Sequence, residues 1–130
     1  MIGLRLHHVA LWVRNLEPMR VFYVDVLGGA SGSLYENPRT GFRSYFISFS
    51  EGPRVELMSR PSEDAAPPVA PAHGYAHIAL SVGSRTAVDE TILRLRSRGV
   101  TVSREPRTTG DGYYEAVIED PEGNTIELVE

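Results

Sequence analysis

Two histidines and two glutamates recur along the chain at nearly one interval. His8 and His77 stand 69 residues apart, and Glu56 and Glu127 stand 71 apart. Imidazole nitrogens and carboxylate oxygens bind divalent ions of intermediate character, among them Ni, Zn, Co, Mn and Fe. Four such ligands leave room in an octahedral shell for water or a chelating substrate. The pattern therefore predicts a metal site, and the residue types do not distinguish among these ions.

The residues around each histidine and each glutamate repeat as well. His-Val-Ala-Leu-Trp-Val at 8–13 matches His-Ile-Ala-Leu-Ser-Val at 77–82, and Arg-Val-Glu-Leu-Met at 54–58 matches Thr-Ile-Glu-Leu-Val at 125–129. Self-similarity at one offset is typical of an internal duplication. We therefore expect two modules of similar fold.

The modules are predicted to be residues 1–60 and residues 73–130. Between them, residues 61–72 contain four prolines and little that could pack against a core. A proline-rich segment of this kind is typical of a semi-extended linker.

Both modules show the same order of elements, strand-helix-strand-strand-strand. The first has strands at 5–13, within 30–36, at 44–49 and around Glu56, with a helix that ends before Gly28. The second has strands at 76–82, 100–103, 114–119 and 125–129, a helix with an apolar stripe of Val88, Ile92 and Leu95, and a polar loop at 107–112. The sequence thus predicts an α+β fold of tandem βαβββ modules, with curved mixed sheets around a metal cavity.

Alternation within the strands decides which residues face the helix. The apolar side chains at odd positions of 9–13 form one continuous face, on which the helix of that module can pack. His8 then points to the opposite, open face, and Glu56 joins it if its two apolar neighbours take the helix side. By the repeat, His77 and Glu127 face the same way in the second module.

A structural role is the alternative interpretation of each residue taken alone. A single histidine on a strand is more often hydrogen-bonded within the fold than bound to a metal. The return of the same residue types at the same places in both repeats favours a ligand role. His7 aligns with Ala76 and is expected on the helix side or at the surface, and His73 is expected to be exposed at the end of the linker.

Composition excludes several classes of partner. With 130 residues, 42% hydrophobic residues and a net charge of −4, the chain is typical of a globular protein without an electrostatic reason to bind nucleic acid or anionic membranes. The absence of cysteine excludes a disulfide framework and a thiolate metal site. No signal-peptide pattern and no apolar run of about 18 residues is present. We expect a cytoplasmic protein.

The repeated motifs resemble the vicinal oxygen chelate superfamily over essentially the whole chain. Asp-Pro-Glu-Gly-Asn-Thr-Ile-Glu-Leu at 120–128 and Phe22-Tyr23 ahead of Leu27-Gly28 add to the likeness. Within the superfamily the sequence is most similar to the glyoxalase I (lactoylglutathione lyase) branch. The resemblance implies a homodimer with one divalent metal ion in each site.

The same resemblance implies a ligand set and a reaction. His8 and Glu56 of one chain would join His77 and Glu127 of the other, and the sequence leaves open whether modules pair within a chain or across two. The reaction would be proton transfer next to a carbonyl through a metal-bound enediolate, as in a carbon–sulfur lyase or isomerase. Glu127 would move the proton, with Glu56 as its reciprocal acid/base or as a permanent ligand.

Three positions differ from glyoxalase I where its substrate is bound. Trp12 replaces an arginine, Arg60 replaces an asparagine, and Arg107 only approximates a basic residue of the later loop. These three are the candidate substrate-binding residues, and the differences argue against dependence on glutathione. The alternatives are a non-catalytic binding protein of the antibiotic-sequestering type and an extradiol-type dioxygenase.

Overall fold

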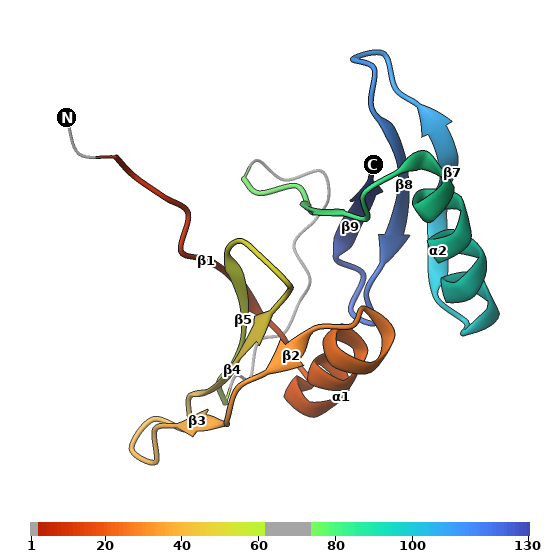
Figure 1. The fold of residues 1–130 in the computed structure, drawn as a ribbon. Coiled ribbons are helices and arrows are strands. Elements are labelled where there is room, and N and C mark those ends of the chain that lie inside the picture. The colour runs from red at the N-terminus through yellow and green to blue at the C-terminus, as the bar shows by residue number, and fades with distance from the viewer. Residues whose placement is uncertain (1–2, 62–73) are drawn as a thin grey trace. The chain divides into compact units, whose positions relative to one another are not determined.

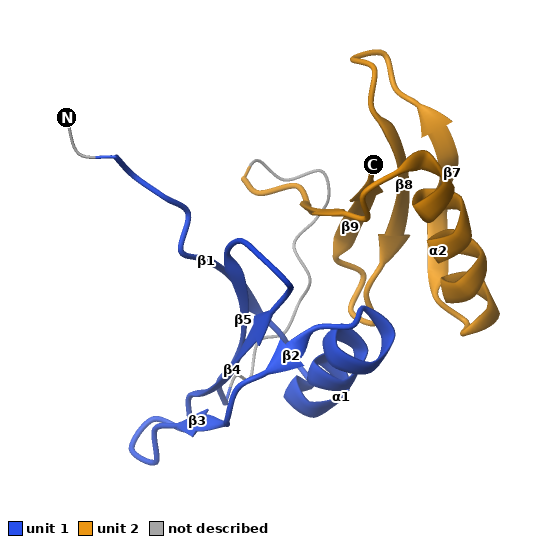
Figure 2. Cartoon of the chain, viewed as in Figure 1, with its two compact units in different colours: residues 1–67 blue, residues 68–130 orange. Residues whose placement is uncertain are grey.

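The computed structural model describes residues 3–61 and 74–130. The chain divides into two compact units, residues 1–67 and 68–130 (Figure 2). All but the first residue of the predicted linker, and His73 with it, lie outside the described residues. Each unit is therefore described by itself.

The first unit contains one helical segment and a mixed sheet (Figure 1). Its helix α1 (Leu16–Val21) continues into a π-helical turn, η1 (Phe22–Val26), and Gly28 ends the segment at a positive φ of 80°. Its strands are β1 (His8–Trp12), β2 (Ala30–Ser31), β3 (Tyr35–Glu36), β4 (Arg43–Ser48) and β5 (Arg54–Ser59).

The sheet of the first unit has the order β1-β5-β4-β2, and β3 also pairs with β4. Only β1 and β5 run parallel, and their register places Ala10 opposite Glu56. The remaining pairs are antiparallel. The sheet is therefore mixed, with the strand that carries His8 at one edge beside the strand that carries Glu56.

The second unit repeats this plan. It contains β6 (Ile78–Ser81), α2 (Arg85–Ser97), β7 (Thr101–Thr108), β8 (Tyr114–Glu119) and β9 (Thr125–Val129). The sheet order is β6-β9-β8-β7, and again only the first pair, β6 with β9, runs parallel. Ser84 caps α2 by accepting a hydrogen bond of 3.1 Å from the backbone N–H of Ala87.

Each helix covers one face of its own sheet. Val55 and Leu57 of β5 are buried beneath α1, and Ile126 and Leu128 of β9 are buried beneath α2. The intervening Glu56 and Glu127 therefore face the other side, because side chains alternate along a strand. The predicted stripe of Val88, Ile92 and Leu95 is buried, with none of the three more than 2% exposed.

A tyrosine and a carboxylate fasten each helix to its sheet. Tyr45 of β4 donates a hydrogen bond of 2.5 Å to Glu17 of α1. Tyr114 of β8 donates one of 2.6 Å to Asp89 of α2. Tyr45 and Tyr114 are 69 residues apart, the same interval as His8 and His77. The duplication thus extends to polar contacts between the helix and the sheet.

The predicted element order is correct, and several boundaries are wrong. The expected strand at 30–36 consists of two separate two-residue strands. The expected strand at 100–103 runs from Thr101 to Thr108, so the expected loop at 107–112 begins two residues too early. The polar residues at 107–112 suggested a loop, but β7 is an edge strand, and the outer side of an edge strand needs no apolar cover. None of the helices in residues 3–61 and 74–130 is long and apolar enough to cross a membrane.

Candidate functional site

The first unit places the side chains of His8 and Glu56 side by side. The Nε2 atom of His8 lies 3.6 Å from Oε1 of Glu56. The His8 side chain is 37% exposed and that of Glu56 only 13% exposed. Their strands, β1 and β5, are parallel neighbours, and Ala10 is the partner of Glu56. His8 stands two residues before Ala10 and so lies on the same face of the sheet as Glu56.

The second unit holds the equivalent pair. The Nε2 atom of His77 lies 3.2 Å from Oε2 of Glu127, with side-chain exposures of 39% and 21%. Ala79, two residues after His77, lies opposite Glu127, as Ala10 lies opposite Glu56. In both units the histidine and the glutamate therefore lie side by side, at the same register, on the face not covered by the helix.

The spacing of each pair fits two neighbouring ligands of one divalent ion. Metal–ligand bonds of about 2.0–2.2 Å to nitrogen and oxygen place adjacent donor atoms roughly 3.0–3.5 Å apart. The second pair falls in that range, and the first needs only a small side-chain adjustment. Among the described residues of either unit, no group of three His, Cys, Asp or Glu side chains could hold an ion. Each unit by itself therefore brings together two candidate ligands.

His7 has a role that the sequence did not indicate. Its Nδ1 atom lies 2.8 Å from Nδ1 of His8, and the two rings meet edge to face. The His8 ring also packs edge to face on Phe46, at 5.2 Å between centroids. These contacts fix the orientation of the His8 ring and leave its Nε2 atom directed at Glu56. The corresponding residue of the second unit is Ala76, so this support exists in the first unit only.

Glu115 is a second residue that the sequence analysis missed. It lies on β8 beside Glu127, and burial raises the pKa of the Glu115 carboxyl. A hydrogen bond with Glu127 and the charge of that carboxylate raise this pKa further, and Arg107 opposes the effect. Glu115 pairs with Arg107 in the register of β7 and β8. The alternation of side chains along β8 could have indicated this contact. It places Glu115 on the same face as Val117, which is the partner of Glu127.

Two of the three candidate substrate-binding residues meet. The guanidinium carbon of Arg60 lies 4.2 Å from the centroid of the Trp12 ring. Phe42 contacts both Trp12 and Tyr35, at centroid distances of 6.2 and 6.0 Å. We refer to Trp12, Tyr35 and Phe42 as the aromatic shelf. Arg107 belongs to the second unit and lies beside Glu115 instead.

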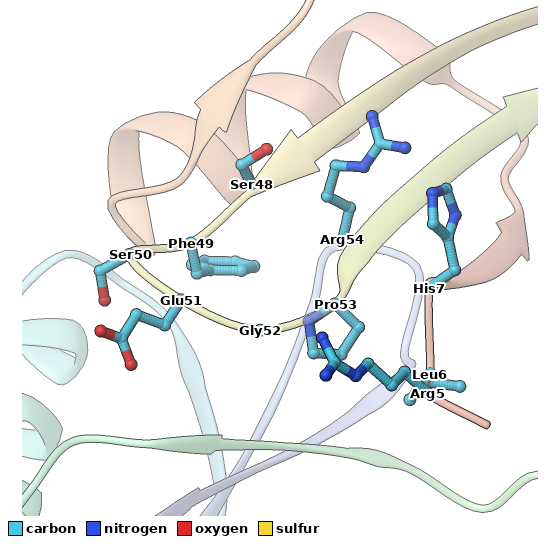
Figure 3. Close-up of a pocket in the computed structure, with 10 residues that line it drawn as sticks. All are labelled: Arg5, Leu6, His7, Ser48, Phe49, Ser50, Glu51, Gly52, Pro53 and Arg54. Atoms are coloured by element: carbon cyan, nitrogen blue, oxygen red, sulfur yellow. The ribbon is translucent and has the colours of Figure 1, made fainter. Parts of the chain in front are cut away.

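A surface depression of about 470 Å³ lies elsewhere on the first unit (Figure 3). It forms between residues 5–7 and the turn that joins β4 to β5, residues 48–54. Arg5, His7 and Arg54 contribute basic side chains to its lining. The side chains of Glu56 and Trp12 are not part of this lining, so the depression is separate from the shelf.

Known proteins share this fold and sequence pattern. The model of the Glyoxalase/Bleomycin resistance protein/Dioxygenase superfamily matches residues 5–128. The lactoylglutathione lyase of Salmonella typhimurium is 30% identical, covering 98% of this chain and 93% of its own. Biphenyl-2,3-diol 1,2-dioxygenase 3 of Rhodococcus globerulus is 32% identical, covering 95% of this chain and 62% of its own.

A solved structure agrees with these relatives. The crystal structure of the glyoxalase family protein from Enterococcus faecalis superposes with a TM-score of 0.80 at 25% identity, covering 96% of both chains. The two proteins therefore share a mixed α+β fold with two curved sheets. The chain belongs to the Glyoxalase/Bleomycin resistance protein/Dioxygenase superfamily.

Proposed function

We propose that this protein is a metal-dependent lyase or isomerase of the glyoxalase I type, which moves a proton between adjacent carbons of a small α-oxygenated carbonyl compound. The observation that supports it is the pair of His–Glu contacts, one at ligand spacing and one close to it, each at the same register of its sheet. Relatives named lactoylglutathione lyase support the same class of reaction.

The proposed ligands are His8, Glu56, His77 and Glu127. The two pairs come together either within one chain or between the two chains of a homodimer. A divalent ion held there would supply Lewis acidity to two adjacent substrate oxygens and so acidify the neighbouring C–H bond. Every donor is nitrogen or oxygen, which suits Ni, Zn, Co, Mn or Fe.

Glu127 is the proposed proton carrier. It accepts a proton from the substrate carbon and returns it to the adjacent carbon, so the overall reaction is an isomerisation with no net gain or loss of protons. Glu115 lies beside Glu127, close enough for the two carboxyl groups to share a hydrogen bond. Glu56 is the reciprocal acid/base or a permanent ligand, and the two histidines serve as ligands only.

Metal reconstitution tests this proposal. Protein stripped of metal should be inactive and should regain turnover of a small α-oxygenated carbonyl compound after addition of Ni or Zn. The methylglyoxal–glutathione hemithioacetal tests the narrow version, in which glutathione carries the substrate. Failure with that adduct but success with a glutathione-free substrate would retain the broad version. Tight ligand binding that a chelator leaves unchanged, with no turnover, would favour the non-catalytic binding protein instead.

A ring-cleaving dioxygenase is the second candidate, because one relative carries that activity in its name. Two observations weigh against it. This chain spans 62% of that relative's length, and four ligands are proposed here, whereas two histidines and one carboxylate suffice for iron in such enzymes. Oxygen uptake with catechol under ferrous iron is the direct measurement. Its appearance, without proton transfer on carbonyl substrates, would favour this activity.

The proposal includes a cytoplasmic homodimer without nucleic acid or membrane partners. The net charge of −4 supports the absence of electrostatic attraction to either polyanion. Light scattering gives the mass in solution, and a monomer with full activity would require the two pairs to meet within one chain.

A further inference from the structure

The aromatic shelf lies on the open face of the first sheet, the face that carries the His8–Glu56 pair. Trp12 is 53% exposed and Tyr35 is 56% exposed, although both belong to strands of the sheet. Single exposed apolar residues are scattered over the surface of most proteins. Large aromatic side chains that are exposed together on one face are instead a common feature of binding sites. The shelf therefore offers apolar area that the unit itself leaves uncovered.

Arg60 adds a positive charge to the shelf. Its guanidinium group stacks on the Trp12 ring, and the side chain lies at the exposed end of β5. Within residues 3–61 and 74–130, its only ring or charge contact is with Trp12. A stacked guanidinium keeps its N–H edge free, and that edge matches the two oxygens of a carboxylate.

The register fixes the distance from the shelf to the proposed reacting centre. Ala10 lies opposite Glu56, and Trp12 lies opposite Met58, two residues further along both strands. Two residues of extended strand span roughly 7 Å. A molecule that reaches from Glu56 to Trp12 is therefore only slightly longer than a single aromatic ring with a short side chain.

We propose that the aromatic shelf and Arg60 bind an aromatic carboxylate, with its ring on Trp12 and its carboxylate on the guanidinium of Arg60. The inference deepens the proposed function and rests on it, because the proposed function determines which end of the substrate reacts. The ring–ring contacts select a flat apolar group, because aromatic pairs gain from edge-to-face and offset geometries that aliphatic groups lack. Arg60 selects the negative charge.

Trp12 itself reports on this binding, since it is the only tryptophan in the chain. Phenylacetate, which carries both a ring and a carboxylate, is added to metal-free protein while the Trp12 fluorescence is recorded. Benzyl alcohol has the ring without the charge, and acetate has the charge without the ring. We expect a saturable fluorescence change with phenylacetate, and affinities at least about 10-fold lower for the other two probes.

Arg60→Gln and Arg54→Gln form a matched pair of variants. Arg54 stacks on Phe46 at 4.2 Å, the same distance that separates Arg60 from Trp12. Arg54 is the first residue of β5, and Arg60 directly follows its last residue. Arg60→Gln should weaken phenylacetate binding about 10-fold or more, while Arg54→Gln should leave it unchanged. Tyr35→Ala, at an exposed position, should weaken binding a few-fold and leave the melting temperature unchanged.

Three results would overturn the inference. One is equal affinity for acetate and phenylacetate, and another is equal loss in the two arginine variants. The third is a blue-shifted Trp12 emission that responds to protein concentration but not to phenylacetate, which would mean that a second copy of the chain covers the shelf. Because the titration uses metal-free protein, it can fail while metal-dependent turnover succeeds, or succeed while turnover fails.

Discussion

Glu127 lies directly opposite Ala79 across the parallel pair β6–β9, and this relationship repeats in the first unit between Glu56 and Ala10. A small side chain at that position leaves space in front of each carboxylate. The histidine two residues earlier then approaches the carboxylate from the side. The duplication has therefore preserved a three-residue geometry, and the chemistry proposed for the protein depends on it.

Removal of one proposed ligand should abolish tight metal binding. Elemental analysis of the purified wild type should give about one divalent ion per chain. His77→Ala and Glu127→Ala should each lower metal affinity by roughly 100-fold or more, because loss of an indirect partner alone costs about 10–100-fold. Glu90→Gln, at an exposed position of α2, is the control and should retain the ion. Full metal content in either alanine variant would exclude that residue as a ligand.

The hydrogen bond between Tyr45 and Glu17 should contribute to folding stability. Tyr45→Phe removes only the hydroxyl and should lower the free energy of unfolding by about 0.5–1 kcal/mol, a value reduced for the exposure of the pair. Tyr113→Phe is the matched control, since the Tyr113 side chain is 56% exposed. Urea unfolding of both variants measures the difference, and equal midpoints would show that the bond does not stabilise the fold.

The same contact predicts how stability depends on pH. The hydrogen bond from Tyr45 lowers the pKa of Glu17, with Arg20 and Arg43 acting in the same direction. The contribution of ionised Glu17 to folding stability is therefore complete above its ordinary pKa of 4.5 and is lost as pH falls through the lowered pKa. Glu17 in turn raises the pKa of Tyr45. The contribution of the protonated Tyr45 hydroxyl to stability is therefore present below its ordinary pKa of 10.0 and is lost as pH rises through the raised pKa.

Glu17→Gln should flatten both limbs of that pH profile. Unfolding midpoints in urea, measured from acidic to alkaline pH, should decline less at each end in the variant than in the wild type. A profile that keeps its acidic limb would assign the limb to another carboxylate.

Gly29 should not tolerate a side chain. A Cβ atom there would lie 2.5 Å from Cγ2 of Ile47 and 2.9 Å from the backbone oxygen of Tyr23. Gly29→Ala should therefore cost about 1–3 kcal/mol through overpacking. At Gly32 the nearest atom is 3.8 Å away, so Gly32→Ala is the control and should be neutral within about 0.5 kcal/mol. Thermal unfolding of the two variants measures the difference in stability between them. Equal stabilities would show that the backbone around β2 shifts to accommodate the added methyl group.

The sequence by itself determined the order of the elements and the face on which each candidate ligand lies. Alternation along 8–13 and 54–58 is a local property with a period of two, so the side of the sheet taken by His8 and Glu56 can be read without coordinates. The repeat then carries the same assignment to the second unit. Family membership followed from the same motifs.

Only the tertiary structure decided which side chains meet. Strand register brought Glu115 to Glu127 and Arg60 to Trp12, and neither contact follows from spacing along the chain. The extent of β7 was also missed, because edge strands carry charged residues that resemble those of a loop. Pairing between strands depends on residues distant in sequence, and so the partners of a side chain appear only when the sheet is assembled.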